Sequence, residues 1–469
     1  MSLTRRVAHN TLIQIVGKIL AIAMGIAVIG MMTRYLGPEQ YGYYATIVAY
    51  LQIVGIAMDL GLTLTTLQLL ATPGTDTKRI TQAAIGLRLA VAIPLLVLAV
   101  IVGSFFPYPA IVKWGMALLA IEMLASSCIQ LATTFFQWKL QMIAVVVADL
   151  VGRAVLLVGV VIATRFDTGF LSILWSIVAG SATVFIILFA AAQRFTSIVP
   201  RFDPVLWKKF IITSWPLALS AGLNLLYLKG DTFILSLTRT PEEVGLYAAP
   251  YRALEILASI PFMFVGIAFP LLRTAWLSDR ERFARMIQKS FDALMLFALP
   301  MVGGTLMLGE RIMTLIAGPA FAPSGRFLQL LIIASGFIFI GTLFGHVIVV
   351  INKQRMMIWG YAATATVALI GYILFIPRWG GWGAAVMTIV AEGMITIITM
   401  TVTRKVTGIK ISLRTTGKAA IATLLMMMLL VSFAHIHVLL LIGIGAIIYG
   451  ALLLVLRAVP HALIQEILP

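Results

Sequence analysis

Charged and polar side chains recur inside the long apolar segments of this 469-residue chain. In the first such segment Asn10, Gln14 and Lys18 follow one another at intervals of four residues, so a helix places all three on one face. Ionisable groups within a membrane are costly, and they generally face an aqueous cavity or a partner. The stripe therefore predicts contact with a polar ligand or with a polar neighbouring helix.

Three further apolar segments carry groups of the same kind: Gln52 and Asp59; Asn224, Lys229 and Asp231; and Arg252 and Glu255. Asp59 has no basic residue at helical spacing within its own segment. Lys229 and Asp231 are two positions apart, so they point to different faces unless nearby glycines unwind the helix. Arg252 and Glu255 are three positions apart, and this spacing suits a structural ion pair as well as a polar cavity.

The composition requires a membrane environment for these segments. Hydrophobic residues make up 61% of the chain and charged residues 11%, and mean hydropathy is +1.06. A water-soluble fold would lack the polar residues needed to cover its surface. The apolar runs show no period-2 alternation, so they predict helices rather than strands of a membrane barrel. The single Cys128 excludes a disulfide framework and a cysteine-based metal site.

We expect an all-α polytopic membrane protein with about fourteen transmembrane helices. The predicted spans are 8–33, 42–70, 81–106, 110–136, 140–164, 170–192, 210–238, 243–272, 287–308, 324–351, 356–376, 382–403, 415–435 and 438–456. With the N-terminus inside, 22 of the 34 Lys and Arg fall in inner segments and seven in outer ones. This bias predicts that both termini face the cytoplasm. The net charge of +17 then reflects contact with anionic inner-leaflet lipid rather than with nucleic acid.

A short motif occurs twice, 203 positions apart, at the start of the second span of each half. Pro38-Glu39-Gln40-Tyr41-Gly42 returns as Pro241-Glu242-Glu243-Val244-Gly245. The repeat predicts two six-helix lobes related by an axis along the membrane normal, as in parallel-repeat transporters. The favoured interpretation of the motif is a matched outer hairpin turn. The predicted divisions are 1–192, a cytoplasmic linker at 193–209, a second lobe at 210–403, and a basic linker with two extra helices at 404–469.

If the pseudo-axis brings together the first two helices of each lobe, they enclose one polar cavity. Its charged residues would be Lys18, Asp59, Lys229, Asp231, Arg252 and Glu255. Elsewhere, Asp149 and Arg153 are four positions apart and predict a structural salt bridge. Arg88 is expected to pair with Glu122 or Asp149. Glu392 has no interpretation from the sequence, and the tail pair His435 and His437 is too small a ligand set for a metal site.

The residues around the repeated motif also carry a family resemblance. The stretches Asn10–Lys18, Arg34–Gly42 and Asp59–Leu62, with Asp231 before Glu243-Val244-Gly245-Leu246-Tyr247, resemble the polysaccharide transporter family. This family includes the Wzx-type O-antigen and lipid-linked oligosaccharide flippases. It belongs to the multidrug/oligosaccharidyl-lipid/polysaccharide exporter superfamily. The resemblance covers essentially the whole chain.

The resemblance implies a flippase that carries polyprenyl-(di)phosphate-linked oligosaccharide from the inner to the outer leaflet by alternating access. Lys18, Lys229 and Arg252 are then candidates to meet the phosphate charge, because cations form strong hydrogen bonds with phosphate oxygens. Asn10, Gln14, Gln52 and Asn224 are candidates to contact sugar hydroxyls. Asp59, Asp231 and Glu255 are candidates to bind a coupling H⁺ or Na⁺. No cofactor and no metal are expected.

Two other functions are alternatives. A cation-coupled drug antiporter of the same superfamily would favour an acidic, aromatic cavity, whereas three cations are expected in this one. A membrane enzyme such as an O-antigen polymerase or ligase would need a catalytic outer loop, and every outer loop is short. The expected partners are the lipid-linked glycan, membrane lipids, a counter-ion and a polysaccharide polymerase. The expected state is a monomer in the cytoplasmic (inner) membrane.

Overall fold

The computed structural model is built from helices. It describes residues 3–59, 61–72, 74–139, 141–195, 199–433 and 436–458; within them, the side chains of 3–15, 64, 216, 217, 220 and 221 are not described. No strand occurs in these ranges. The elements are α1 (Leu3–Asp59), α2 (Leu62–Leu70), α3 (Thr77–Phe105), α4 (Ala110–Trp138), α5 (Met142–Arg165), α6 (Phe170–Gln193), α7 (Pro204–Thr238), α8 (Pro241–Ser278), α9 (Arg280–Ala317), the 3₁₀ turn η1 (Pro319–Phe321), α10 (Ser324–Val350), α11 (Gln354–Trp379), α12 (Gly381–Thr407), α13 (Arg414–Val431) and α14 (Val438–Val455).

Thirteen of the predicted spans each correspond to one helix, and the second span is divided between α1 and α2. Among the described residues, twelve helices are long and apolar enough to cross a membrane. One of them, α1, contains the first predicted span and most of the second, joined across a kink at Gly37 (φ 65°, ψ 177°). The helix α2 completes the second span. The expected all-α polytopic membrane fold is therefore confirmed.

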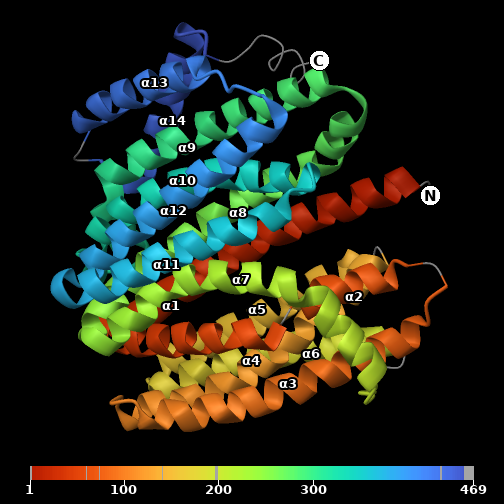
Figure 1. The fold of residues 1–469 in the computed structure, drawn as a ribbon. Coiled ribbons are helices and arrows are strands. Elements are labelled where there is room, and N and C mark those ends of the chain that lie inside the picture. Colours follow the sequence, from red (N-terminus) through yellow and green to blue (C-terminus); the bar gives the residue numbers. More distant parts are fainter. Residues whose placement is uncertain are drawn as a thin grey trace. The chain divides into compact units, whose positions relative to one another are not determined.

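Contacts divide the chain into two compact units, Met1–Gly245 and Leu246–Pro469. The first contains α1 to α7 and the second contains α8 from Leu246 onward together with α9 to α14 (Figure 1). The helix α7 packs against α1, α2 and α3, so it groups with the first unit by contacts. The lobe boundary that we predicted at 193–209 was inferred from the sequence repeat and not from contacts. It stays a prediction.

The first unit is held together at small residues. A side chain added at Gly152 on α5 would come within 2.8 Å of the Gly180 carbonyl oxygen on α6. Gly159, two turns after Gly152 on α5, packs against Ser176, which is one turn before Gly180 on α6. Helices in a membrane gain little from hydrophobic exclusion, and small residues let their backbones approach closely. The neighbouring α1 packs on α5 in the same way, with Gly17 against Val146.

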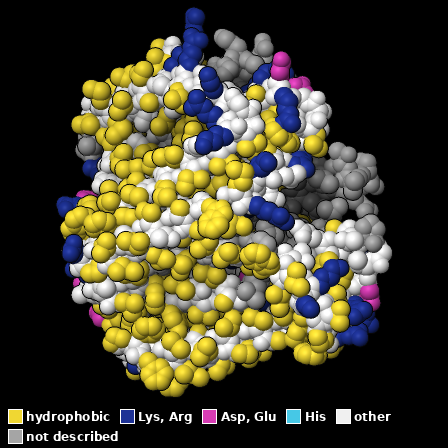
Figure 2. Space-filling view, in the orientation of Figure 1, with side chains coloured by type: hydrophobic (Ala, Val, Ile, Leu, Met, Phe, Trp, Pro, Cys, Tyr) yellow, Lys and Arg dark blue, Asp and Glu magenta, His cyan; other side chains and the backbone are white. Residues whose placement is uncertain are grey.

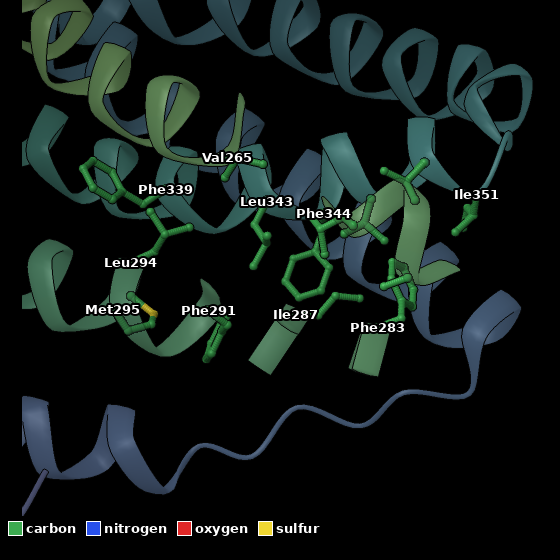
Figure 3. Close-up of a cluster of buried hydrophobic side chains, with 14 of the residues drawn as sticks. Val265, Phe283, Ile287, Phe291, Leu294, Met295, Phe339, Leu343, Phe344 and Ile351 are labelled. Carbon is green, nitrogen blue, oxygen red and sulfur yellow. The ribbon is translucent and has the colours of Figure 1, made fainter. Parts of the chain in front are cut away.

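The second unit has a hydrophobic core between α8, α9 and α10. Aromatic and aliphatic side chains interdigitate there, among them Phe283 and Phe291 on α9 and Phe339 and Phe344 on α10 (Figure 3). The tail helices α13 and α14 pack on α9. There, the Tyr449 hydroxyl donates a 2.8 Å hydrogen bond to the Leu296 carbonyl. His437 accepts a capping bond from the Leu439 N–H at the start of α14, while His435 lies outside the described residues.

Hydrophobic side chains also cover most of the visible surface (Figure 2). Large apolar residues are fully or half exposed on many helices, including Trp114 (69% exposed) and Trp359 (78% exposed). A soluble monomer rarely exposes apolar patches on this scale. This surface indicates contact with the hydrocarbon of a bilayer, so the chain is a multi-pass membrane protein.

The segment that precedes α7 is fastened to α3. Asp203 forms a 2.7 Å ion pair with Arg79, and its other carboxylate oxygen accepts from the Leu206 N–H as an N-cap of α7. The Trp207 indole N–H donates to the Ala83 carbonyl at 2.9 Å. These bonds fix the start of α7 relative to α3.

We expect the contacts of Asp203 to stabilise the protein less in acid. The hydrogen bonds that Asp203 accepts from Arg79 and Leu206 hold its pKa below the ordinary value. A carboxyl with a lowered folded-state pKa stabilises the fold above its unfolded pKa, and this contribution is lost as pH falls through the folded-state pKa. Thermal unfolding in detergent across pH 7 to pH 3 should therefore show a smaller acid-induced fall in Tm for Asp203→Asn than for the parent protein. Equal falls in both proteins would contradict this role.

Candidate functional site

The second predicted span is interrupted where its polar residues lie. The helix α1 ends at Asp59 and α2 begins at Leu62, with Gly61 between them in a left-handed conformation (φ 69°). A side chain at Gly61 would also come within 2.9 Å of the Ser214 carbonyl oxygen on α7. Glycine thus satisfies both the backbone conformation and the close approach of α7. Interrupted helices of this kind expose backbone polar groups at transport sites.

We expect Gly61→Ala to destabilise the protein measurably. The left-handed conformation alone costs a non-glycine residue about 1–2 kcal/mol, and the added methyl group also crowds Ser214. The matched control is Gly304→Ala, because a side chain at Gly304 on α9 would meet no atom within 4 Å. Thermal unfolding in detergent should show a clear loss of Tm for Gly61→Ala and little change for the control. Equal Tm values for the two variants would contradict the account of this break.

A buried arginine stabilises the interruption. The guanidinium of Arg88, on α3 and only 1% exposed, donates to Asp59 Oδ1 at 2.6 Å and to Thr63 Oγ1 at 2.9 Å. It also donates to the Met58 carbonyl at 3.2 Å, one of the carbonyls left open at the end of α1. The Thr63 hydroxyl donates to Asp59 Oδ1 at 2.6 Å. Arg88 and Asp59 therefore link three helices at the break.

This network corrects the prediction that Arg88 pairs with Glu122 or Asp149. Glu122 instead accepts hydrogen bonds from the hydroxyls of Ser126 on its own helix and Ser181 on α6. Asp149 pairs with Arg153 at 3.0 Å, as predicted from their spacing. Sequence spacing identifies pairs within one helix, whereas Arg88 reaches its carboxylate from a different helix.

The helix α7 pairs with α1 over the stretch that contains its polar residues, although these residues lie on more than one face of α7. Three contacts define the antiparallel register: Gly61 lies against Ser214, Gly222 lies against Ile56, and the tilted rings of Tyr50 and Phe233 have centroids 5.8 Å apart. This register places Gln52 between the levels of Gly222 and Phe233. We name this region the α1–α7 seam; its polar residues are Gln52, Asn224, Tyr227, Lys229 and Asp231.

The seam residues differ in burial and bonding. Asp231 is fully buried, and its Oδ1 accepts from the Thr232 N–H at 2.5 Å and the Thr232 hydroxyl at 3.2 Å. Asn224 Nδ2 donates to the Tyr227 hydroxyl at 2.8 Å. Gln52 is half-buried, and its Oε1 is enclosed without a hydrogen-bond donor in the described structure. Lys229 is also half-buried.

The helix α7 continues through Gly222 and Gly230, so these glycines do not unwind it. Lys229 and Asp231 consequently stay on different faces, as their spacing predicts. Asp231 takes the fully buried face, whereas Lys229 remains accessible in part.

The other predicted site residues have separate positions. Lys18 is exposed on the first half of α1, while the side chains of Asn10 and Gln14 lie outside those described. Arg252 and Glu255, in the second unit, form an ion pair at 2.8 Å with each side chain about one-third exposed (29% and 32%). The ion pair between Arg252 and Glu255 is thus as their spacing suggested. Phosphate binding by Arg252 and ion binding by Glu255 stay predictions.

The second unit also buries a carboxyl that the sequence left uninterpreted. Glu392 on α12 is 5% exposed, and Tyr361 on α11 lies within electrostatic range of it. No hydrogen bond or ion pair of the Glu392 carboxyl occurs within the described part of the chain. Across those same residues, no group of three or more His, Cys, Asp and Glu side chains is suited to hold a metal ion.

Comparison with known proteins identifies the family. The sequence profile described as polysaccharide biosynthesis protein matches residues 31–326, which include the interrupted span, the whole α1–α7 seam and both copies of the repeated motif. The chain belongs to this family. No curated protein matches the sequence.

Solved structures share the fold of this polysaccharide biosynthesis family member. It is similar to the lipid II flippase MurJ in an inward closed conformation, with a TM-score of 0.79, 11% identity, and coverage of 95% of this chain and 98% of that one. An inward-facing multidrug resistance MATE transporter of the MOP superfamily gives a TM-score of 0.67, 12% identity, and coverage of 85% and 98%. A eukaryotic MATE transporter gives 0.62, 16% identity, and coverage of 90% and 98%. The chain therefore shares the fold of these transporters.

Proposed function

We propose that this protein is a flippase that carries an oligosaccharide on polyprenyl phosphate or diphosphate from the inner to the outer leaflet of the cytoplasmic membrane. The observation that carries the proposal is the family match across residues 31–326. A membrane protein of a polysaccharide biosynthesis family, with a fold found in transporters, has a lipid-linked sugar intermediate as its natural cargo. Both termini face the cytoplasm in this proposal, because the basic residues concentrate on that side.

The polar groups of the seam suit such a cargo. The charged and hydroxylated headgroup needs a hydrated path, whereas the polyprenyl chain can stay in the bilayer. Lys229 and Arg252, with Lys18, would bind phosphate oxygens through charge-assisted hydrogen bonds. The Oε1 of Gln52, which has no hydrogen-bond donor among the described residues, is an acceptor for a sugar hydroxyl, and Asn224 supplies a second amide on α7.

The acids would couple transport to a gradient of H⁺ or Na⁺. Asp231 is the strongest candidate, because it is a fully buried carboxylate on a spanning helix and Thr232 holds its Oδ1 in place. Asp59 is committed to Arg88 in this structure, so ion binding there would require the pair to separate. Glu255 is similarly paired with Arg252.

The proposal is tested by complementation. Expression of the chain in a cell that lacks its own polysaccharide flippase should restore surface glycan, provided that the donor pathway is supplied. The same cells should show no added resistance to cationic dyes. Dye export without glycan restoration would replace the proposal with a drug antiporter, the function of the MATE proteins that share the fold.

A further inference from the structure

The two copies of the repeated motif touch each other through their glycines. A side chain added at Gly42 would overlap the Pro241 carbonyl oxygen, and one added at Gly245 would overlap the Pro38 carbonyl oxygen. The contact is reciprocal: the glycine of each copy packs on the proline of the other. Both copies lie within the first unit, Met1–Gly245.

Glycine is required at positions 42 and 245 because a side chain would not fit there, and not because of the backbone conformation. Neither Gly42 nor Gly245 is among the glycines with positive φ, so an alanine could adopt the backbone conformation at either position. The added methyl group, however, would overlap the backbone of the opposite copy. Glycine therefore serves here to let two backbones meet directly, as it does where membrane helices cross closely.

The first copy is anchored by tyrosines in its own half. The Tyr35 hydroxyl donates to Asp167 Oδ1 at 2.8 Å and accepts from the Gly169 N–H at 2.8 Å, in the turn between α5 and α6. The Tyr43 ring meets Phe170, the first residue of α6, edge to face at 6.4 Å. The first copy is thus fixed to the turn that joins the fifth and sixth helices of its half.

The second copy is followed by a tyrosine, Tyr247, that packs in a similar way. Tyr247 is fully buried and packs edge to face on Phe327 at 5.8 Å. A side chain added at Gly381, the first residue of α12, would come within 3.5 Å of the Tyr247 ring. The residues next to each copy thus pack on a pair of helices near it in the sequence, and the two copies meet at their glycines within the first unit.

We propose that residues 38–42 and 241–245 form a clasp that closes the outer end of the transport path, and that transport requires the clasp to part. The proposal rests on the proposed function and on the orientation that places both copies outside. Two backbone surfaces without side chains at their contact can separate and meet again without repacking of side chains. An alternating-access protein needs such a joint at each end of its path.

A thiol-accessibility experiment tests the clasp. Cys128→Ala removes the native thiol, and Val244→Cys places a reporter next to Gly245, where the parent side chain is 1% exposed. A membrane-impermeant maleimide is then applied from outside. Adding Gly42→Ala should raise the labelling rate about tenfold or more, because overpacking of this size disfavours the closed arrangement. The control is Gly266→Ala on α8, where an added side chain would meet no atom within 4 Å. Equal labelling rates in the two variants would overturn the proposal.

A second measurement leaves both glycines intact. In the Val244→Cys protein, labelling should accelerate when lipid-linked glycan and an ion gradient are present, and the labelled fraction should lose transport because the adduct prevents closure. Full transport by labelled protein would overturn the clasp. If instead Gly42→Ala opens the site to maleimide while no variant moves glycan, the clasp stands and the substrate assignment fails.

Discussion

Replacement of Arg88 by leucine is expected to destabilise the protein by about 1–3 kcal/mol, the cost typical of leaving hydrogen-bonding groups without their buried partner. The guanidinium is 1% exposed and bonds Asp59, Thr63 and the end of α1 at once. Its loss removes the cationic partner of the Asp59 carboxylate, which keeps only the Thr63 hydroxyl as a donor, and it removes the Arg88 donor from the Met58 carbonyl. Thermal unfolding in detergent and the level of folded protein in the membrane measure the effect.

The matched control is Arg153→Leu. Arg153 also pairs with an aspartate, but at 36% exposure and within a single helix. Such a pair contributes only about 0–1 kcal/mol. The double variant Asp59→Leu/Arg88→Leu should recover part of the loss, because it leaves no uncompensated charge. Similar Tm values for Arg88→Leu and Arg153→Leu would show that the network does not stabilise the break.

The second large effect is expected on transport, from Lys229→Ala and Asp231→Asn. Loss of a charge-assisted hydrogen bond costs about 1.5–3 kcal/mol, so Lys229→Ala should raise the apparent KM for lipid-linked glycan by roughly 10- to 100-fold. Asp231→Asn keeps the shape of a fully buried side chain but removes its negative charge. It should abolish the dependence of transport on the ion gradient.

These variants are best compared with Lys353→Ala, since Lys353 is exposed in the turn before α11. Each is assayed by glycan restoration in cells at matched expression, and the KM and gradient effects by initial rates in proteoliposomes. Normal transport by both Lys229→Ala and Asp231→Asn would show that these residues of the α1–α7 seam do not take part in transport.

The helices could be predicted from the sequence because hydrocarbon admits few alternatives. A run of about 20 apolar residues must satisfy its own backbone hydrogen bonds, and a helix does so locally. The interruption at Asp59–Gly61 could not be predicted, because it depends on contact with Ser214, some 150 positions away in the sequence. The union of the first two spans across Gly37 likewise depends on a backbone conformation that apolarity does not reveal.

The site was predictable in part for a related reason. Helical periodicity correctly paired Asp149 with Arg153 and Arg252 with Glu255, since both partners share a helix. It missed the pairing of Arg88 with Asp59, which crosses from α3 to α1. The repeated motif was interpreted as a pair of separate turns, whereas its glycines bring the two copies into contact. Tertiary contacts of this kind have no signature in the spacing of one sequence.

The most direct test of the proposed function is leaflet translocation in proteoliposomes. Purified protein is reconstituted with a fluorescent polyprenyl-diphosphate oligosaccharide, with and without a pH or Na⁺ gradient, and appearance of the headgroup in the opposite leaflet is followed. We predict gradient-dependent translocation that Asp231→Asn uncouples. Absence of translocation across several glycans, together with extrusion of cationic dyes, would contradict the flippase assignment.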